Sequence, residues 1–243
     1  LRAPVLVAEG ATLILSGQEA ATYRLSATAG SFISVAGTLY VQDTTVASWD
    51  EGAGTPRYSD KEKRHVFRPY IIGWSNSRLM IGGSVLDSLG YAAPKSFGLA
   101  FSAGPKSVAQ QITGARAPTG IVVDNFFHNF EYGFYSYEAD DVSLVGNEYR
   151  DNVLYAIDPH DRSHRLLIAL NTTYDTKAKH GIIVSREVNF SWIVGNVSHT
   201  NAGSGFMIDR NSVDNFVYAN VAFDNKQDGL TLFESSCRLA VGD

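Results

Sequence analysis

Residues 171–196, Asn171-Thr-Thr-Tyr-Asp-Thr-Lys-Ala-Lys-His-Gly-Ile-Ile-Val-Ser-Arg-Glu-Val-Asn-Phe-Ser-Trp-Ile-Val-Gly-Asn196, form one unit of a repeat that decides the fold. Asparagine occupies positions 125, 147, 171, 196 and 220, at spacings of 22, 24, 25 and 24 residues. A small residue occupies positions 133, 156, 181, 205 and 229, at spacings of 23, 25, 24 and 24 residues. Two independent columns that keep one period indicate a repeat protein.

Each unit of the repeat is expected to contain short strands. After each small residue, apolar side chains alternate with mixed ones, and a period of two is typical of a strand with one buried face. A second apolar stretch precedes each asparagine, as in Trp192-Ile-Val194. Two or more strands per turn of about 24 residues predict an all-β parallel β-helix. The leucine framework of leucine-rich repeats is absent, and propeller blades are longer than this unit.

We interpret the chain as one domain, a single solenoid over residues 1–243. Strand-like stretches at 11–15, 32–35 and 38–41 predict the first coils. Two excursions are expected, one near 49–68 and one near 103–119. The asparagine column is interpreted as structural, with stacked turn residues that accept a left-handed backbone and hydrogen-bond along the stack.

Composition limits the possible functions. The formal net charge of −5 excludes the broad basic surface of a nucleic-acid binder, although it permits a local basic groove. Cys237 is the only cysteine, which excludes an intrachain disulfide and a cysteine-based metal site. No apolar run reaches membrane-spanning length, so we expect no membrane insertion. Because the chain starts at Leu1 and not at Met, we expect that an N-terminal segment was removed or not included.

The repeat also predicts which side chains lie side by side, because equivalent positions of successive coils are about 4.8 Å apart in a β-helix. Counted from the small residue, the second, fourth and fifth positions give three columns: Tyr135, Asp158, Ile183, Met207 and Thr231; then Tyr137, His160, Ser185, Asp209 and Phe233; then Glu138, Asp161, Arg186, Arg210 and Glu234. We therefore expect a cluster on one exposed sheet surface, made of His160, Asp158, Arg186, Tyr135 and Tyr137.

Basic and imidazole groups gather in the same part of the chain. They are Arg162, Arg165, Lys177, Lys179 and Arg186, with His160, His164 and His180. In an acidic protein this local excess predicts an anionic ligand. Pro159 occupies a repeated strand position, where it removes a ladder donor, and such a departure is typical of a functional site. Since no calcium-binding nonapeptide repeat is present, we expect no required metal and no cofactor.

The segment Asp158-Pro-His-Asp-Arg-Ser-His164 resembles the Asp-Pro-His-Asp-x-Ser signature of mannuronan C5-epimerases. The stretches Tyr132–Asp141 and His180–Val188 are also similar to that family. The match is closest to its periplasmic, calcium-independent type of bacterial alginate biosynthesis. The resemblance implies a right-handed parallel β-helix in the periplasm that acts on polymannuronate. It also names other periplasmic proteins of alginate biosynthesis and export as candidate partners.

For the reaction, the resemblance implies that His160 is the base that removes the C5 proton and that Arg186 neutralises the substrate carboxylate. A fixed cation is needed because the developing enolate carries two negative charges. Asp158 or Asp161 could orient the imidazole, and water, Tyr135 or Tyr137 could return the proton. The predicted substrate-binding residues are Tyr135, Tyr137, Arg162, Lys179, His180, Asp209 and Arg210.

Two alternatives to epimerisation stay open at this point. A polyuronate lyase would share the proton abstraction and then expel the C4 substituent, with a tyrosine as the acid. A non-catalytic alginate-binding module would use the same surface and would not depend on His160.

Overall fold

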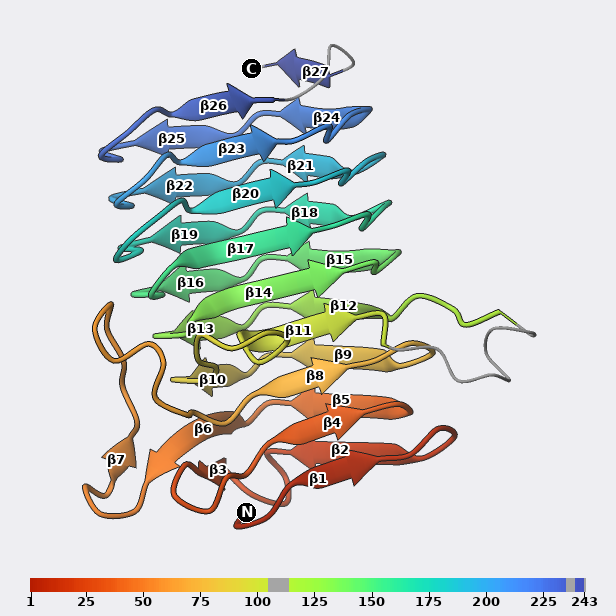
Figure 1. The fold of residues 1–243 in the computed structure, drawn as a ribbon, viewed down its shortest axis with the longest axis vertical. Helices are drawn as coiled ribbons and strands as arrows, with labels where there is room; N and C mark the ends of the chain where they lie inside the picture. Colours follow the sequence, from red (N-terminus) through yellow and green to blue (C-terminus); the bar gives the residue numbers. More distant parts are fainter. Residues whose placement is uncertain (105–113, 235–238, 243) are drawn as a thin grey trace.

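The computed structural model describes residues 1–104, 114–234 and 239–242 as a tall stack of coils (Figure 1). The described residues form 27 strands and no helix, so the predicted all-β parallel β-helix is confirmed. Most coils contribute one strand to each of three parallel sheets. None of the described segments forms a helix long and apolar enough to cross a membrane. Of the excursion predicted near 103–119, residues 105–113 lie outside the described residues.

The first sheet faces the reader in Figure 1 and contains one strand from each of nine successive coils. Its strands are β1 (Val5–Val7), β4 (Ile33–Val35), β8 (Ile71–Gly73), β11 (Gly98–Ser102), β14 (Tyr132–Tyr137), β17 (Tyr155–His160), β20 (Ile182–Ser185), β23 (Phe206–Asp209) and β26 (Leu230–Phe233).

The second sheet follows the first in each coil. It consists of β2 (Thr12–Ser16), β5 (Thr38–Gln42), β9 (Arg78–Gly82), β12 (Thr119–Val123), β15 (Val142–Val145), β18 (Leu167–Ala169), β21 (Trp192–Val194), β24 (Asn215–Tyr218) and β27 (Leu239–Gly242).

The third sheet completes the coil. It consists of β3 (Thr22–Ser26), β6 (Thr45–Asp50), β10 (Val85–Asp87), β13 (Phe126–His128), β16 (Glu148–Arg150), β19 (Thr172–Tyr174), β22 (Val197–His199) and β25 (Val221–Phe223), and the short β7 (Thr55–Pro56) pairs antiparallel with β6.

One apolar core runs through the centre of the stack. Inward-facing side chains of the first sheet pair across coils, as Phe134 does with Ile157 and Ile157 with Ile182, and all three are buried. The small-residue column lets each of these strands start close to the third sheet. A Cβ atom added at Gly181 would lie 2.1 Å from the Ser198 hydroxyl oxygen, so this coil requires glycine at that position, although the preceding coil accommodates Ala156.

The asparagine column is a buried hydrogen-bond ladder, as predicted. The Nδ2 atom of Asn147 donates to Oδ1 of Asn171 at 3.0 Å, and Asn171 donates to Asn196 at 3.0 Å. The expected left-handed backbone lies one residue earlier, however, at Asp124, Gly146, Leu170, Gly195 and Ala219. The preceding residue turns the chain, which leaves each asparagine side chain directed inward along the stack.

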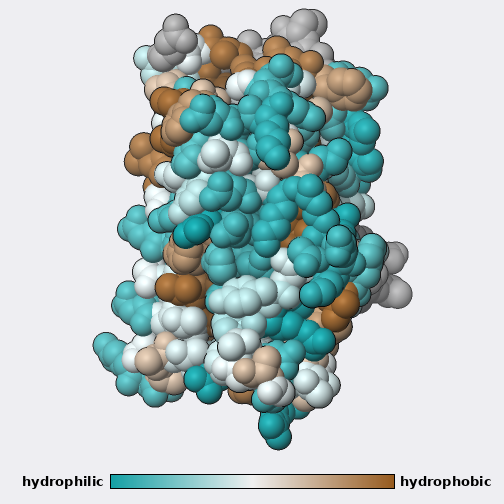
Figure 2. Space-filling view, turned by 90° about the vertical axis from the view of Figure 1, so that its left-hand side faces the viewer, coloured by the Kyte–Doolittle hydropathy of each residue, from teal (hydrophilic) through white to brown (hydrophobic). Residues whose placement is uncertain are grey.

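Residues 51–70 leave the solenoid between β6 and β8, and we call them the 51–70 segment. The segment projects to the left in Figure 1 and is fastened to later coils. Its Ser59 amide donates to Oδ1 of Asn129 at 2.7 Å, and Nζ of Lys177 donates to the Ser59 carbonyl at 3.0 Å. Figure 2 shows this flank of the molecule, where hydrophilic residues cover most of the surface.

Candidate active site

The candidate site lies on the outer face of the first sheet, where β14, β17, β20 and β23 end. The structure reproduces the register expected from the repeat: Tyr137 pairs with His160, His160 with Ser185, and Ser185 with Asp209. Parallel strand pairing therefore holds the side chains of these columns at a fixed spacing along the stack.

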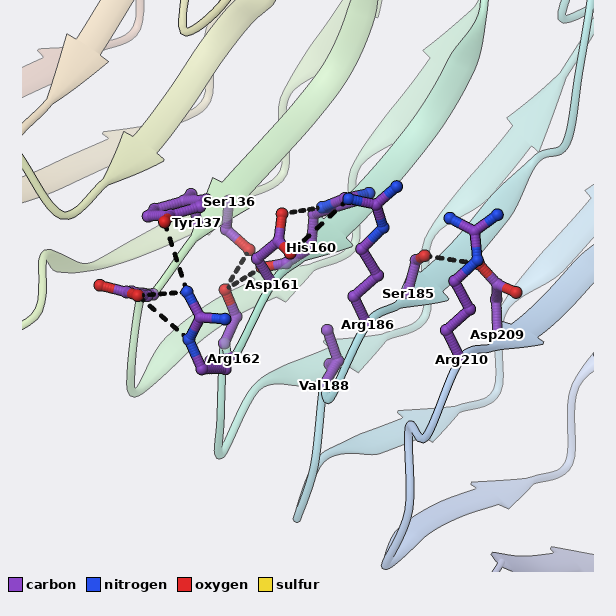
Figure 3. Close-up of polar contacts among 12 residues, drawn as sticks. Ser136, Tyr137, His160, Asp161, Arg162, Ser185, Arg186, Val188, Asp209 and Arg210 are labelled. Carbon is purple, nitrogen blue, oxygen red and sulfur yellow. Dashed lines mark hydrogen bonds and ion pairs between the residues drawn. The ribbon is translucent and has the colours of Figure 1, made fainter. Parts of the chain in front are cut away.

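His160, Asp161 and Arg186 form a connected group (Figure 3). Nδ1 of His160 donates to Oδ2 of Asp161 at 2.5 Å, and Nη1 of Arg186 lies 3.9 Å from Oδ1 of the same carboxylate. The imidazole and the carboxylate are each 20% exposed, whereas the guanidinium is 49% exposed. Of the two carboxylates expected to orient His160, Asp161 makes the hydrogen bond.

Local backbone geometry explains how Asp161 and Arg186 reach this position. Each directly follows its strand and has a left-handed conformation, with φ of 38° and 63°. Arg210 has the same place one coil later, with φ of 47°. The left-handed residue turns the chain out of the sheet. The side chains of Asp161, Arg186 and Arg210 therefore lie along the same edge of the site.

Pro159 interrupts strand pairing beside His160. The register between β17 and β20 contains pairs at Ile157 and at His160 and skips the two positions between them. Because proline has no N–H, it cannot donate a hydrogen bond to the neighbouring strand. On the other side, Pro159 still pairs in register with Ser136 of β14.

Burial lowers the pKa of His160 below its usual value of 6.5, although the hydrogen bond to Asp161 opposes this effect. The imidazole is therefore neutral near pH 7. Since Nδ1 donates to Asp161, the lone pair resides on Nε2, for which the described residues provide no hydrogen-bond partner. His160 can thus accept a proton at Nε2 and keep Asp161 as a counter-ion.

Asp158 and Asp209 are more buried than expected for an exposed sheet surface. Asp158 is 2% exposed and Asp209 is 5% exposed, and Oδ1 of each has no hydrogen-bond partner. Burial raises the pKa of Asp158 well above its usual range, and the carboxylates of Asp161 and Asp209 raise it further. The expectation of surface exposure was wrong for Asp158 because the neighbouring side chains cover it.

A cavity of about 290 Å³ opens beside this group. Among the cations of its wall, Lys179 and Arg186 lie on either side of β20 and Arg210 follows β23. Tyr132 and Tyr155 line it from the start of β14 and β17. The lining residues are Tyr132, Tyr155, Asp158, His160, Lys179, His180, Ile183, Ser185, Arg186, Met207, Asp209, Arg210 and Phe233. The structure therefore brings together most of the residues predicted for catalysis and substrate binding.

Tyr135 and Tyr137 lie on the N-terminal side of His160 and do not line this cavity. The ring of Tyr135 is 5.9 Å from that of His160, and with 7% exposure it too is buried, contrary to expectation. Burial raises the pKa of Tyr135. Nζ of Lys95 sits 3.2 Å from the centre of the Tyr137 ring, without a hydrogen-bond partner.

Several of the predicted basic groups are engaged elsewhere. Arg162 pairs with Glu138 at 2.5 Å and donates to the Tyr137 hydroxyl at 3.3 Å, and it does not line the cavity. Arg165 pairs with Asp140 and Asp141 in a turn, and Lys177 binds the 51–70 segment. The ring of His164 lies against that of Phe190 and outside the cavity lining. Proximity in sequence therefore overstated the number of cations at the site.

Sequence reasoning missed Tyr132, Tyr155 and Lys95. The two tyrosines directly precede the small-residue column, in the same place as His180, so the repeat contained the signal. Burial raises the pKa of Tyr155 to about 12 and that of Lys95 is lowered by burial to about 8. Lys95 lies in an irregular stretch before β11, for which the repeat supplies no register.

A comparison with protein families places the chain in a family of periplasmic proteins. The family model described as periplasmic copper-binding protein (NosD) matches residues 105–240, more than half of the chain, and the chain belongs to that family. Its description names copper, but the described residues contain no group of three or more His, Cys, Asp or Glu side chains that could hold a metal ion. The part of the chain that the structure describes therefore does not fit a copper site.

More particularly, the chain is homologous to mannuronan C5-epimerases, which confirms the resemblance found in the sequence. It is 44% identical to the mannuronan C5-epimerase of Pseudomonas putida over 245 residues, which cover 100% of this chain and 46% of that protein. It is 44% identical to mannuronan C5-epimerase AlgG of Azotobacter vinelandii, over 100% of this chain and 45% of that protein. The chain thus spans about half the length of these relatives.

Solved structures agree with this assignment. A crystal structure of the periplasmic alginate epimerase AlgG superposes with a TM-score of 0.92 at 41% identity, over 96% of this chain and 54% of that one. The A-module of the Azotobacter vinelandii epimerase AlgE4 superposes with a TM-score of 0.51 at 13% identity, over 96% of this chain and 67% of that one. The second likeness concerns the fold alone.

Proposed function

We propose that the protein is a periplasmic isomerase that inverts C5 of β-D-mannuronate residues in alginate to give α-L-guluronate. The homology to mannuronan C5-epimerases supports the reaction and the polymeric substrate. The periplasmic relative of known structure and the NosD family description support the location. The observation that carries the proposal is a neutral His160 beside Arg186 on adjacent coils of one groove.

In the proposed mechanism, Nε2 of His160 removes the proton from C5. The electron pair of the broken C–H bond moves into the carboxylate to give an enediolate with two negative charges. Arg186, half exposed and pointing into the groove, stabilises this charge through its planar guanidinium. Asp161 holds the imidazole through Nδ1 and stabilises the imidazolium that forms.

A proton must then reach C5 from the opposite face of the sugar. Water in the open groove and the hydroxyls of Tyr132 or Tyr155 are the candidate donors, because both tyrosines line the cavity. Tyr135 and Tyr137, the donors expected from the sequence, lie outside that lining. Lys179, His180 and Arg210 extend the groove along the stack, where they are suited to neighbouring uronate carboxylates.

Incubation with polymannuronate in deuterated water tests the proposal. We expect deuterium at C5 and guluronate signals by NMR in chains of unchanged length. Unsaturated ends that absorb in the ultraviolet would instead identify a lyase. The variant His160→Ala should lose the exchange, whereas His199→Ala, on the third sheet, should retain it. If His160→Ala exchanges C5 as fast as the parent protein, the proposed base is wrong.

A further inference from the structure

A second cavity, of about 380 Å³, lies under the 51–70 segment. Its lining residues come from the β6–β7 hairpin and from the chain that follows it, and they include Asp50, Arg57, Tyr58, Lys63, Val66 and Arg68. It belongs to the flank seen in Figure 2, where the segment leaves the solenoid. None of its lining residues belongs to the groove around His160.

Arg68 is the unusual residue of this cavity, because its side chain is 1% exposed. Nε donates to the Gly90 carbonyl at 2.6 Å, and Nη1 donates to the carbonyl and to Oδ1 of Asn129 at 2.6 and 2.9 Å. All of these acceptors are uncharged. Nη2 is buried and has no hydrogen-bond partner.

Among the described residues, no carboxylate oxygen forms an ion pair with Arg68 within 4.0 Å, and the charges of Glu131 and Asp87 act on it from further away. The buried carboxylate of Glu131, whose charge acts on Arg68, is hydrogen-bonded by Arg64 instead. Burial lowers the pKa of Arg68 to about 9, so the guanidinium is still charged at neutral pH. A buried charge is normally paired, because removing it from water is energetically unfavourable. The structure therefore holds a buried cation in a cavity wall that no carboxylate contacts directly, and its Nη2 group is left without a hydrogen-bond partner.

The remainder of the wall has the same polarity. Arg57 and Lys63 add two cations, whereas Asp50 is the one carboxylate among the lining residues, with Oδ2 4.0 Å from Nε of Arg57. Tyr58 and Val66 supply apolar surface beside these charges. This combination suits a molecule with an anionic group and a compact body.

We propose that this cavity binds the carboxylate group of a molecule of about monosaccharide size. Arg68 is the buried cation that contacts the carboxylate, and Arg57 and Lys63 lie at the rim of the cavity. The Asn129 side chain accepts a hydrogen bond from Arg68 and also exchanges hydrogen bonds with the backbone of Ser59. Asn129 therefore holds two parts of the cavity wall in place before a ligand binds. The argument does not depend on the epimerase reaction, since the two cavities share no residue.

Calorimetric titration tests this site. The three titrants are sodium mannuronate, sodium phosphate and sodium chloride, at equal ionic strength. We expect mannuronate to bind and chloride to give no saturable heat. Arg68→Met should abolish binding. As a second test that leaves the buried Arg68 in place, we combine Arg57→Gln with Lys63→Gln. We expect this double variant to weaken binding roughly tenfold or more through loss of two charged donors. The groove variant Arg186→Gln removes the contribution of the groove around His160, and we expect saturable mannuronate binding at the second cavity to persist in it.

Each outcome decides the proposal. Binding of both mannuronate and phosphate identifies a general oxyanion site, and binding of mannuronate alone identifies a sugar-acid site. Binding of phosphate alone refutes the carboxylate assignment. Equal heats with chloride refute the site altogether. If Arg186→Gln removes binding and the Arg57 and Lys63 changes do not, the ligand occupies the groove and the second cavity is not a binding site.

Discussion

The change Asp161→Asn tests the proposed role of the carboxylate between His160 and Arg186. Asparagine also adopts left-handed backbone readily, so the turn at φ of 38° should be preserved. The substitution removes the charge-assisted hydrogen bond from Nδ1 of His160, which at 2.5 Å is short and well shielded. Such a bond contributes about 1.5–3 kcal/mol. At about 1.4 kcal/mol for each factor of ten, we expect kcat to fall roughly 10- to 100-fold.

The pH profile of the same variant has a defined direction. Asp161 raises the pKa of His160 against the lowering effect of burial, so its removal lowers that pKa further. A base works only when unprotonated, so the acid limb of kcat/KM should move to lower pH. The assay is the initial rate of C5 exchange between pH 5 and 8, by NMR.

A matched control separates this effect from a general response to losing a turn aspartate. Asp141 has a similar left-handed conformation, with φ of 54°, and its carboxylate accepts hydrogen bonds from Arg165 away from the groove. Asp141→Asn should leave both kcat and the pH profile unchanged. If Asp161→Asn keeps kcat within twofold of the parent, or moves the acid limb to higher pH, the proposed role of Asp161 is refuted.

Three further changes test other parts of the structure. Lys95→Met should raise KM for polymannuronate several-fold with little effect on kcat. We expect the parent to bind more weakly as pH rises through about 8, where Lys95 loses its charge, and the variant to lack this pH dependence. An unchanged KM would contradict this. Asp158 keeps its proton in the folded protein and releases it on unfolding above pH 3.8, so the parent loses folding stability as pH rises above that value. Asp158→Asn removes this proton release and should melt at a higher temperature than the parent at pH 7. The difference in melting temperature should disappear near pH 4. Asn171 is fully buried, and its side chain makes four hydrogen bonds, to Leu144, Asn147 and Asn196. Asn171→Ala should therefore lower the free energy of unfolding by about 3 kcal/mol in denaturant titrations, and a loss below about 1 kcal/mol would contradict the ladder's contribution.

The repeat predicted the positions of side chains better than their environments. Because the strands alternate with period two and each coil adds about 24 residues, the pairing of Tyr137, His160, Ser185 and Asp209 followed from the sequence. The same reasoning indicated that Arg186 follows Ser185 at the strand end. These are consequences of local hydrogen-bonding geometry, which the sequence encodes directly.

Burial and ion pairing depend on side chains from several coils, and the repeat does not encode them. Asp158 faces outward by register and is still buried beneath its neighbours. Lys95 approaches Tyr137 from an irregular stretch that has no counterpart in later coils. Arg165 and Lys177 lie close to His160 in sequence, yet a turn carboxylate and the 51–70 segment engage them. Such partners required the three-dimensional structure.

The parallel pairing of β14, β17, β20 and β23 has a consequence for how such a site can change. Hydrogen bonding between neighbouring strands sets the axial separation of functional groups, so that separation changes only in steps of about 4.8 Å. A cation can lie one coil from His160, as Arg186 does, or two coils from it, as Arg210 does. The scaffold has no backbone position at an axial distance between one coil and two. Finer adjustment is left to the length and rotamer of the side chain. Long, flexible arginine side chains at the strand ends therefore provide the adjustment by which a rigid scaffold could fit its groove to the polyanion that we propose as its substrate.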